Sequence, residues 1–356
     1  MIYLIIFIFL ICVRFALNDE ALLRRQLFPG FIFSIFIFSA FRFQVGCDWH
    51  NYNEQYLGYN QDILNSFSFT GEPFYAALIQ ALQFFDLSYP WLNVATSFIF
   101  FFGVYKLAIR QPDPLATLIF MFPILILNMP MSGIRQGAAI GMMCFAYLAF
   151  IDKKIFKYLI FTILASGFHT SALIFLFFIP FLGGNFSYGR IFLAILLGVP
   201  GLLLLVSSSF AQIAIERYIT NSYEAYGAIY RIFTLVISAI MFLIFFRTQW
   251  KEKYEDEYIL MMLASLMMLF CMLMVFVSST IADRIGYFII PLQAVLFARI
   301  PFFKVSWKIF WVAFPYVIIS IIFIAWMAWS SLFQACYLPY NNFLLGVPYN
   351  EITLFK

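Results

Sequence analysis

The chain has 356 residues, of which 64% are hydrophobic and 11% are charged, with a formal net charge of +4. This composition excludes a soluble globular domain, and the single basic residues scattered between apolar runs exclude a nucleic-acid-binding surface. Apolar runs long enough to cross a bilayer recur from Met1 to Ser330, so we expect an all-α, polytopic integral membrane protein. We expect one transmembrane domain over residues 1–330 and a short outer-face tail over 331–356.

The first half of the chain predicts a series of membrane helices and one long polar connection. The expected helices lie near residues 2–17, 27–42, 89–109, 115–130 and 132–151. The first of them lacks a preceding basic residue and a small-residue cleavage site, which argues against a cleaved signal peptide. The polar connection, about residues 43–88, contains an amphipathic run from Pro73 to Phe85 that predicts a helix on the outer face.

Residues 155–182 are apolar except around Ser166 to Ser171, where His169 lies. This pattern fits either one long helix or two short helices that meet at His169. Lys and Arg concentrate in cytoplasmic connections of membrane proteins, and only two short helices put the later basic connections on the same side as the earlier ones. We therefore predict a short intramembrane hairpin with His169 at its tip.

The remaining helices are expected near residues 190–208, 228–247, 257–279, 283–300 and 308–330. The total is about 12 transmembrane helices, with both termini outside. Most of the 21 Lys and Arg residues then lie on the cytoplasmic side. The basic residues left outside are Arg42, Arg135, Arg217, Arg231, Arg284 and Lys356.

Apart from the terminal lysine, this outer set consists of arginines, most of them at helix ends. A guanidinium group binds phosphate oxygens in a bidentate manner and stays charged when partly buried. We therefore expect an outward-facing cavity for an anionic ligand. Structural ion pairs are the alternative, because Asp283 lies beside Arg284, and Asp48 or Glu72 can pair with other arginines. We expect some of the arginines to be purely structural.

One apolar helix begins with Arg135 and Gln136 close to its N-terminus. An arginine at membrane depth costs about 2.5–3.5 kcal/mol, so it normally has a partner or a function. Pro130 ends the preceding helix, Ser132 is a suitable N-cap, and glycines at four-residue spacing form a face that another helix can approach closely. We expect a helix N-terminus that binds an anion with Arg135. The alternative is an arginine that reaches lipid headgroups at the interface.

His169 is the histidine that lies within an apolar segment. Near neutral pH an imidazole accepts a proton from a hydroxyl group, which a glycosyl acceptor requires. The alternative is a hydrogen-bonded packing histidine at a helix kink. Asp48 and Glu72 are alternative general bases, or partners for Arg42 and Arg135.

The start of the polar connection mixes charged, amide and aromatic side chains around Arg42, Asp48, Trp49 and Tyr52. Such a mixture binds sugars by stacking and hydrogen bonding, and the alternative is a solvated loop with interfacial aromatic residues. The 5 cysteines and 2 histidines show none of the usual zinc or iron–sulfur spacings, so we expect no metal and no cofactor. Cys47 and Cys336 share the outer side in this topology and are either a disulfide or two unrelated small residues.

Short motifs along the chain come in a characteristic order. They are Arg42…Val45-Gly46-x-Asp48…Tyr52, Gly71-Glu72-Pro73-Phe74, Ser132-x-x-Arg135-Gln136-x-x-Ala139, Phe168-His169-x-Ser171-Ala172-Leu173, Asp283-Arg284…Tyr287 and Tyr337-Leu338-Pro339-Tyr340. In this order they resemble the EpsG family, the Wzy-like polymerases of bacterial exopolysaccharide, capsule and O-antigen lipopolysaccharide. Two positions depart from the family pattern: Cys47 replaces a small hydroxyl residue, and Gly137 replaces a larger apolar one.

The resemblance implies an enzyme of the bacterial inner membrane with a fold like the GT-C class of membrane glycosyltransferases. It implies that a growing glycan on undecaprenyl pyrophosphate is transferred to a single lipid-linked repeat unit at the outer face of the membrane. The implied partners are this donor and acceptor, the lipid bilayer, and a chain-length regulator and flippase. A ligase that uses the same chemistry is one alternative. A transporter or flippase is another, although the chain shows no half-to-half repeat.

We therefore expect a metal-independent glycan transfer in which Arg135 and Arg284 hold the donor pyrophosphate. His169, or failing it Asp48 or Glu72, is expected to take the proton from the acceptor hydroxyl. The other residues expected to bind substrate are Arg42, Ser132, Gln136, Trp49, Tyr52, Arg231, Asp283 and Tyr287.

Overall fold

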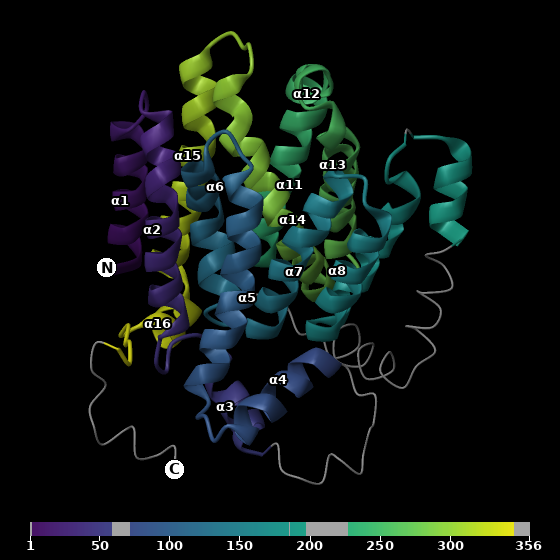
Figure 1. Cartoon of the computed structure of the whole chain (residues 1–356). Coiled ribbons are helices and arrows are strands. Elements are labelled where there is room, and N and C mark those ends of the chain that lie inside the picture. Colours follow the sequence, from purple (N-terminus) through teal and green to yellow (C-terminus); the bar gives the residue numbers. More distant parts are fainter. Residues whose placement is uncertain (1, 59–71, 185, 197–226, 345–356) are drawn as a thin grey trace.

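A computed structural model describes residues 2–58, 72–184, 186–196 and 227–344 (Figure 1). These residues form a helical bundle without β-strands, apart from one isolated bridge between Arg42 and Asn342. In the described part of the chain, 7 helices are long and apolar enough to cross a membrane, and four shorter apolar helices accompany them. The predicted all-α, multi-pass membrane fold is confirmed. The count of about 12 is not, because most of the helix expected at 190–208 lies outside the described residues.

The first half of the chain contains the following helices in order. They are α1 (Ile2–Ala16), α2 (Ala21–Ala40), α3 (Trp49–Leu57), α4 (Pro73–Phe84), α5 (Pro90–Ile109), α6 (Pro114–Met121), its π-helical continuation η2 (Phe122–Ile126), and α7 (Ile134–Ile151). The predicted amphipathic helix over 73–85 is confirmed by α4.

The described residues of the second half are also mainly apolar helices. Its labelled helices are α8 (Ile155–Phe168), the 3₁₀-helix η3 (Thr170–Phe181), α11 (Ala228–Ile240), the π-helical η5 (Met241–Phe246), α12 (Arg247–Lys253), α13 (Glu255–Val275), α14 (Ser279–Arg299), the short 3₁₀-helix η6 (Ile300–Phe302), α15 (Lys308–Trp329) and α16 (Ser331–Tyr337). Residues 188–196, before the next undescribed segment, are also helical.

Two helix starts differ from the sequence prediction. Helix α2 begins at Ala21 rather than near residue 27, because the guanidinium of Arg24 donates to the carbonyl oxygens of Leu17 and Asn18 and stabilises the first turn. Helix α7 begins at Ile134, with Gly133 rather than Ser132 as its N-cap residue. The predicted capping role of Ser132 is therefore wrong, and its hydroxyl has a different partner in the site described below.

Of the glycine face predicted on α7, Gly141 makes the expected close helix contact, where α7 crosses α5, whereas Gly133 and Gly137 lie against residues 128–130. A Cβ atom at Gly141 would lie 2.4 Å from the carbonyl oxygen of Ile99, and one at Gly103 would lie 2.0 Å from the carbonyl oxygen of Gly141. The two backbones approach too closely for any side chain, as in other small-residue helix contacts in membranes. This contact fixes the position of α7, which lies deep in the bundle with most of its residues buried.

The bundle has two chemically different ends (Figure 1). We call one the Glu72 end: it carries α3, α4 and α16, drawn at the bottom of the figure. We call the other the basic end: it carries α12 and the α1–α2, α5–α6 and α7–α8 connections, where Arg110 pairs with Asp152 and Lys153 pairs with Asp256. The described part of the predicted tail packs at the Glu72 end, since the Tyr337 hydroxyl donates to the carbonyl oxygen of Leu127 at 3.0 Å.

Candidate functional site

The segment over 155–182 folds back on itself, as the two-helix prediction required. The hydroxyl group of Tyr158 on α8 donates to the carbonyl oxygen of Phe175 on η3 at 2.6 Å. Between the two helices, His169 has an extended backbone with φ −155° and ψ 117°. The prediction that His169 lies at the turn between two short helices is therefore confirmed.

Helix α4 packs across this turn. Its Phe74 ring lies against Gly167, where an added Cβ atom would come within 1.9 Å of the ring carbon Cδ2. The rings of Phe74 and Phe168 also contact each other, with centroids 6.2 Å apart. Since Glu72 is the N-cap residue of α4, this packing carries its carboxylate to the tip of the hairpin.

Glu72 joins the two residues that the sequence singled out. One carboxylate oxygen, Oε1, lies 2.8 Å from Nδ1 of His169, and the other, Oε2, lies 2.7 Å from Nη1 of Arg135. The carboxylate thus connects α4, the hairpin and the first turn of α7. The sequence named these three residues as catalytic candidates, and the structure brings all of them together.

The environment of Glu72 keeps it ionised. Burial by itself raises the pKa of this carboxyl, but the hydrogen bond with His169 and the charge of Arg135 outweigh burial and hold the pKa below its ordinary value. A carboxylate accepts hydrogen bonds and does not donate them, so a neutral His169 presents its proton on Nδ1 to Glu72. Nε2 is then the basic nitrogen of the ring, in the arrangement of carboxylate–histidine pairs in hydrolases.

Arg135 lies between two tyrosine rings. Its guanidinium carbon is 5.4 Å from the ring centroid of Tyr52 and 5.7 Å from that of Tyr75, and its Nε donates to the Tyr52 hydroxyl at 3.3 Å. Tyr52 accepts from Nε and Glu72 accepts from Nη1, while no described residue accepts a hydrogen bond from Nη2. The side chain is 38% exposed. Arg135 is therefore held firmly and still has donors for a ligand.

Asp48 lies next to the start of α7 through Ser132. The Ser132 hydroxyl donates to Oδ2 of Asp48 at 3.0 Å and accepts from the Asp48 backbone N–H at 3.4 Å. Just before it, Gly46 has a φ of 106°, and a Cβ atom there would lie 1.8 Å from the carbonyl oxygen of Met131. Only glycine combines this φ with such a close approach, so Gly46 lets the Asp48 loop pack on the residues that precede α7.

Arg42 and Trp49 are both buried in the interior. Arg42 is 1% exposed and donates to the carbonyl oxygens of Ser39, Val45 and Met131 and to the Asn93 side chain. Trp49 is 2% exposed and packs on its aromatic neighbours. The expectation that these two residues contact sugars is corrected, because both hold the Asp48 loop in place.

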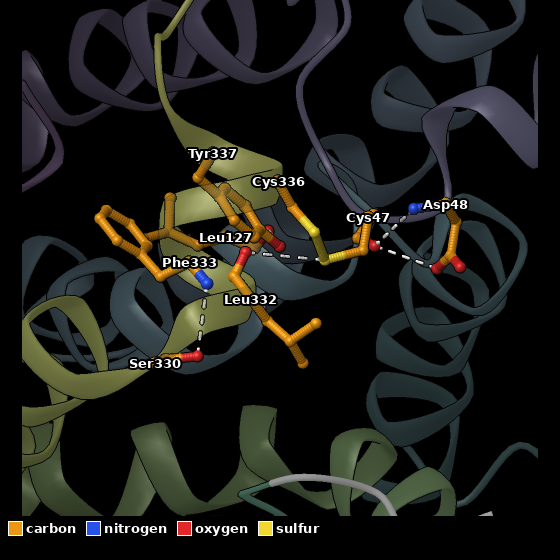
Figure 2. The surroundings of a disulfide bond; sticks show 9 residues. Cys47, Asp48, Leu127, Ser330, Leu332, Phe333, Cys336 and Tyr337 are labelled. Carbon is orange, nitrogen blue, oxygen red and sulfur yellow. Dashed lines mark hydrogen bonds between the residues drawn. A yellow bond between two sulfur atoms is a disulfide. The ribbon is translucent and has the colours of Figure 1, made fainter.

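A disulfide between Cys47 and Cys336 joins this loop to α16, with Cα atoms 4.8 Å apart (Figure 2). Of the two alternatives for these cysteines, the disulfide is the one present. The backbone N–H of Gly46 also donates to the carbonyl oxygen of Cys336 at 2.7 Å. Figure 2 shows Asp48 immediately beside the bridge, so the disulfide restrains a candidate site residue.

The remaining candidates lie on α7, α11 and α14. The Gln136 side chain donates to the carbonyl oxygen of Arg284 at 2.6 Å, which ties α7 to α14. Arg284 and Arg135 both lie within electrostatic range of the His169 ring. Arg231 forms two hydrogen bonds of 2.7 Å with Asp283, and its guanidinium lies 5.3 Å from the ring centroid of Tyr287.

This pairing favours the structural alternative for Arg231, with Asp283 as its partner. Arg231, Asp283 and Tyr287 form a largely buried connection between α11 and α14. Arg217 lies outside the described residues. Among those that are described, no group of three or more His, Cys, Asp or Glu residues could hold a metal ion.

Tyr75 is a site residue that the sequence analysis missed. It follows Glu72 by three residues in the first turn of α4, so both side chains lie on the same side of that helix. That spacing was readable in the amphipathic run. The contact between the Tyr75 ring and Arg135 could not be predicted from the sequence, because Arg135 lies on another helix.

The fold and the site define a multi-pass membrane protein with a cluster of ionisable side chains at one end of the bundle. The chain belongs to the EpsG family, whose model matches residues 25–342. EpsG is a family of Wzy-like polysaccharide polymerases, so the resemblance carried by the motifs is confirmed. No curated protein and no solved structure matches the chain, and the likeness to GT-C glycosyltransferases stays a prediction.

Proposed function

We propose that this protein polymerises lipid-linked oligosaccharide repeat units at the Glu72 end of the bundle. The donor is a growing glycan on undecaprenyl pyrophosphate, and the acceptor is a single lipid-linked repeat. The observation that carries the proposal is the carboxylate of Glu72, which bridges an arginine and a histidine. A phosphate-binding cation and an oriented base are the two groups that transfer from a pyrophosphate to a hydroxyl requires.

Two independent features favour an outward orientation of the Glu72 end. Lys and Arg gather at the opposite end, in the connections around Arg110 and Lys153, as cytoplasmic connections do. The Cys47–Cys336 disulfide lies at the Glu72 end, and disulfides persist in oxidising compartments. Finished repeat units would then meet the site on the face where the polymer grows.

In the donor subsite, Arg135 is the main ligand of the pyrophosphate. Its Nη2 donors have no acceptor among the described residues, and its partial exposure gives access to a lipid-linked ligand. Arg284 lies within electrostatic range of His169 and supplies a second positive charge. As the glycosidic bond to the pyrophosphate breaks, these two cations stabilise the negative charge that develops on the leaving oxygen.

In the acceptor subsite, His169 is the general base. The acceptor hydroxyl attacks the anomeric carbon of the donor sugar, its proton passes to Nε2 of His169, and the lipid pyrophosphate leaves with the electrons of the broken C–O bond. Glu72 holds the ring through Nδ1 and stabilises the imidazolium that forms. Asp48 is hydrogen-bonded to Ser132 and orients the loop beside the site.

The test compares glycans in a strain that lacks this protein after variants are returned to it. We expect His169→Ala and Arg135→Ala to reach the membrane and to leave single-repeat glycan without long chains. His50→Ala is the matched histidine control, because His50 is exposed on α3, and Arg25→Ala is the arginine control, because Arg25 is exposed on α2. Both controls should restore long chains.

The same experiment separates the alternatives. Loss of a ligase leaves long polymer that is not attached to its final acceptor, and loss of a flippase leaves repeat units on the inner face of the membrane. Either pattern in the deletion strain would overturn the polymerase proposal. Normal chain lengths in the His169→Ala strain would overturn the role given to that residue.

A further inference from the structure

The basic end carries an open groove that has no part in the chemistry proposed at the Glu72 end. Its floor is α7, with Phe145, Leu148 and Ala149, and its walls are α5 and α8. The groove has about 400 Å³ of free volume. Sites that bind organic ligands fall in this size range, with mostly apolar linings and a few placed polar groups.

Three basic side chains form the rim of the groove. Lys106 and Arg110 lie one turn apart at the C-terminal end of α5, and Lys157 lies in the first turn of α8. Arg110 pairs with Asp152, at 2.7 Å, whereas no described carboxylate pairs with Lys106 or Lys157. The rim therefore carries an excess of positive charge that the described carboxylates do not neutralise.

The apolar part of the groove continues away from this rim along the helices. The ring of Phe145 contacts the ring of Phe102 with centroids 5.5 Å apart and stacks on the ring of Phe161 at 5.2 Å. Lys106 extends over the Phe102 ring, with its ammonium nitrogen 5.3 Å from the centroid. Phe102 itself is 43% exposed, so this aromatic surface opens to the side of the bundle.

We propose that this groove binds an anionic phospholipid of the leaflet at the basic end, with its phosphate between Lys106 and Lys157 and an acyl chain along the aromatic floor. The inference rests on where the charged rim and the aromatic surface lie along the helices. The charges lie at helix ends, where lipid headgroups are, and the aromatic surface lies farther along the same helices, where acyl chains are. A soluble phosphate compound would use the charges and leave the aromatic floor without a partner.

Charge complementarity selects an anionic over a zwitterionic lipid. A choline headgroup brings its own cation close to the phosphate and would place it against two unpaired lysines. A glycerol headgroup adds hydroxyl groups and no positive charge. Each Lys or Arg near a membrane surface contributes about a 5-fold preference for anionic lipid, so removing both lysines is expected to weaken binding about 30-fold.

The experiment uses the full-length protein in vesicles of equal parts phosphatidylcholine and phosphatidylglycerol. Native mass spectrometry after gentle extraction measures how much of each lipid stays bound. We expect wild-type protein to retain phosphatidylglycerol selectively, and the variant Lys106→Gln/Lys157→Gln to lose that retention. Both lysines are exposed, so their replacement leaves the packed interior unchanged.

The matched control is Lys251→Gln/Lys308→Gln. It removes two exposed lysines from the same end of the bundle, outside the groove, and Lys251 also lies near an aromatic ring, 5.8 Å from the centroid of Tyr258. The control variant should retain phosphatidylglycerol like wild-type protein. An equal loss in both double variants would show diffuse surface attraction and overturn the proposal, and so would equal retention of the two lipids.

A further variant and a competition measurement test the same proposal. Asp152→Asn removes the carboxylate that partly neutralises the rim, so retention of phosphatidylglycerol should increase. Added glycerol 3-phosphate should not displace the bound lipid, because it cannot use the aromatic floor. Displacement would instead identify a site for a soluble phosphate compound and overturn the lipid proposal.

Discussion

Both ends of the bundle contain buried arginines with a complete set of partners, but the Glu72 end also has an arginine that is partly exposed. At the basic end, Asp113 is fully buried and lies 3.1 Å from Arg14 and 3.7 Å from Arg24, and Arg299 is enclosed by Glu257 and Gln111. These ion pairs are closed to a ligand. At the Glu72 end, by contrast, Arg135 is partly exposed and shares the carboxylate of Glu72 with His169.

This difference shows how a structural ion pair can be told from a functional one. A buried arginine with a complete set of partners stabilises helix contacts and offers no donor to a substrate. Arg135 contacts the carboxylate of Glu72 and two aromatic rings, and its side chain is still partly exposed. Arg42, at the same end, is closed like the arginines of the basic end, so position along the membrane normal does not decide the role.

The largest expected effect comes from Glu72→Gln. The amide cannot accept hydrogen bonds from both Arg135 and His169 and no longer stabilises an imidazolium, so polymerisation should fall roughly 10²–10⁴-fold. Purified protein and lipid-linked repeats would give the rate, and the thermal unfolding temperature would report folding. If Glu72→Gln kept normal activity, the carboxylate would be structural, and the contrast between the two ends would disappear.

At the basic end, Asp113→Ala should lower the stability of the fold. It leaves Arg14 and Arg24 buried without their carboxylate, which costs about 3–5 kcal/mol of folding free energy. Thermal unfolding in detergent measures the loss. Asp152→Ala is the control, because its partner Arg110 is largely exposed and such pairs contribute about 0–1 kcal/mol. Equal stability losses in the two variants would contradict the closed ion pair inferred at Asp113.

The pH dependence of stability should separate wild-type protein from Glu72→Gln. The pKa of Glu72 in the folded protein lies below the ordinary value of 4.5. Its contribution to stability is therefore present above about pH 4.5 and is lost as the pH falls through the lower, folded-state pKa. We expect the stability advantage of wild-type protein over the variant to be constant from neutral pH to about 5 and to shrink below that. An advantage that grew on acidification would contradict the assigned shift.

The smallest expected effect concerns Tyr75. Its hydroxyl has no hydrogen-bond partner among the described residues, whereas its ring lies 5.7 Å from the Arg135 guanidinium. Tyr75→Phe should therefore leave the polymerisation rate unchanged. Tyr75→Leu removes the cation–π contact, and the rate should fall about 2–30-fold. A loss in Tyr75→Phe would show that the hydroxyl contacts substrate.

Much of this fold could be read from hydropathy because membrane helices are specified locally. The turn at His169 is an example: the positions of basic residues along the chain distinguished two short helices from one long helix. The close helix contact at Gly141 was also readable, since four-residue spacing puts small residues on one side of a helix. The start of α7 could not be predicted, because the Ser132 hydroxyl bonds to Asp48 in a distant loop and does not cap the helix.

From sequence alone, Arg135 and His169 stood out, since a charged or titratable side chain in an apolar segment needs a reason to be there. The role of Glu72 stayed open between base and partner, and Arg42 could not be separated from Arg135. Glu72 lies 63 positions from Arg135 and 97 from His169 along the chain. Contacts over such separations depend on how α4 packs across the hairpin, so tertiary structure decided which arginine is open and which carboxylate it shares.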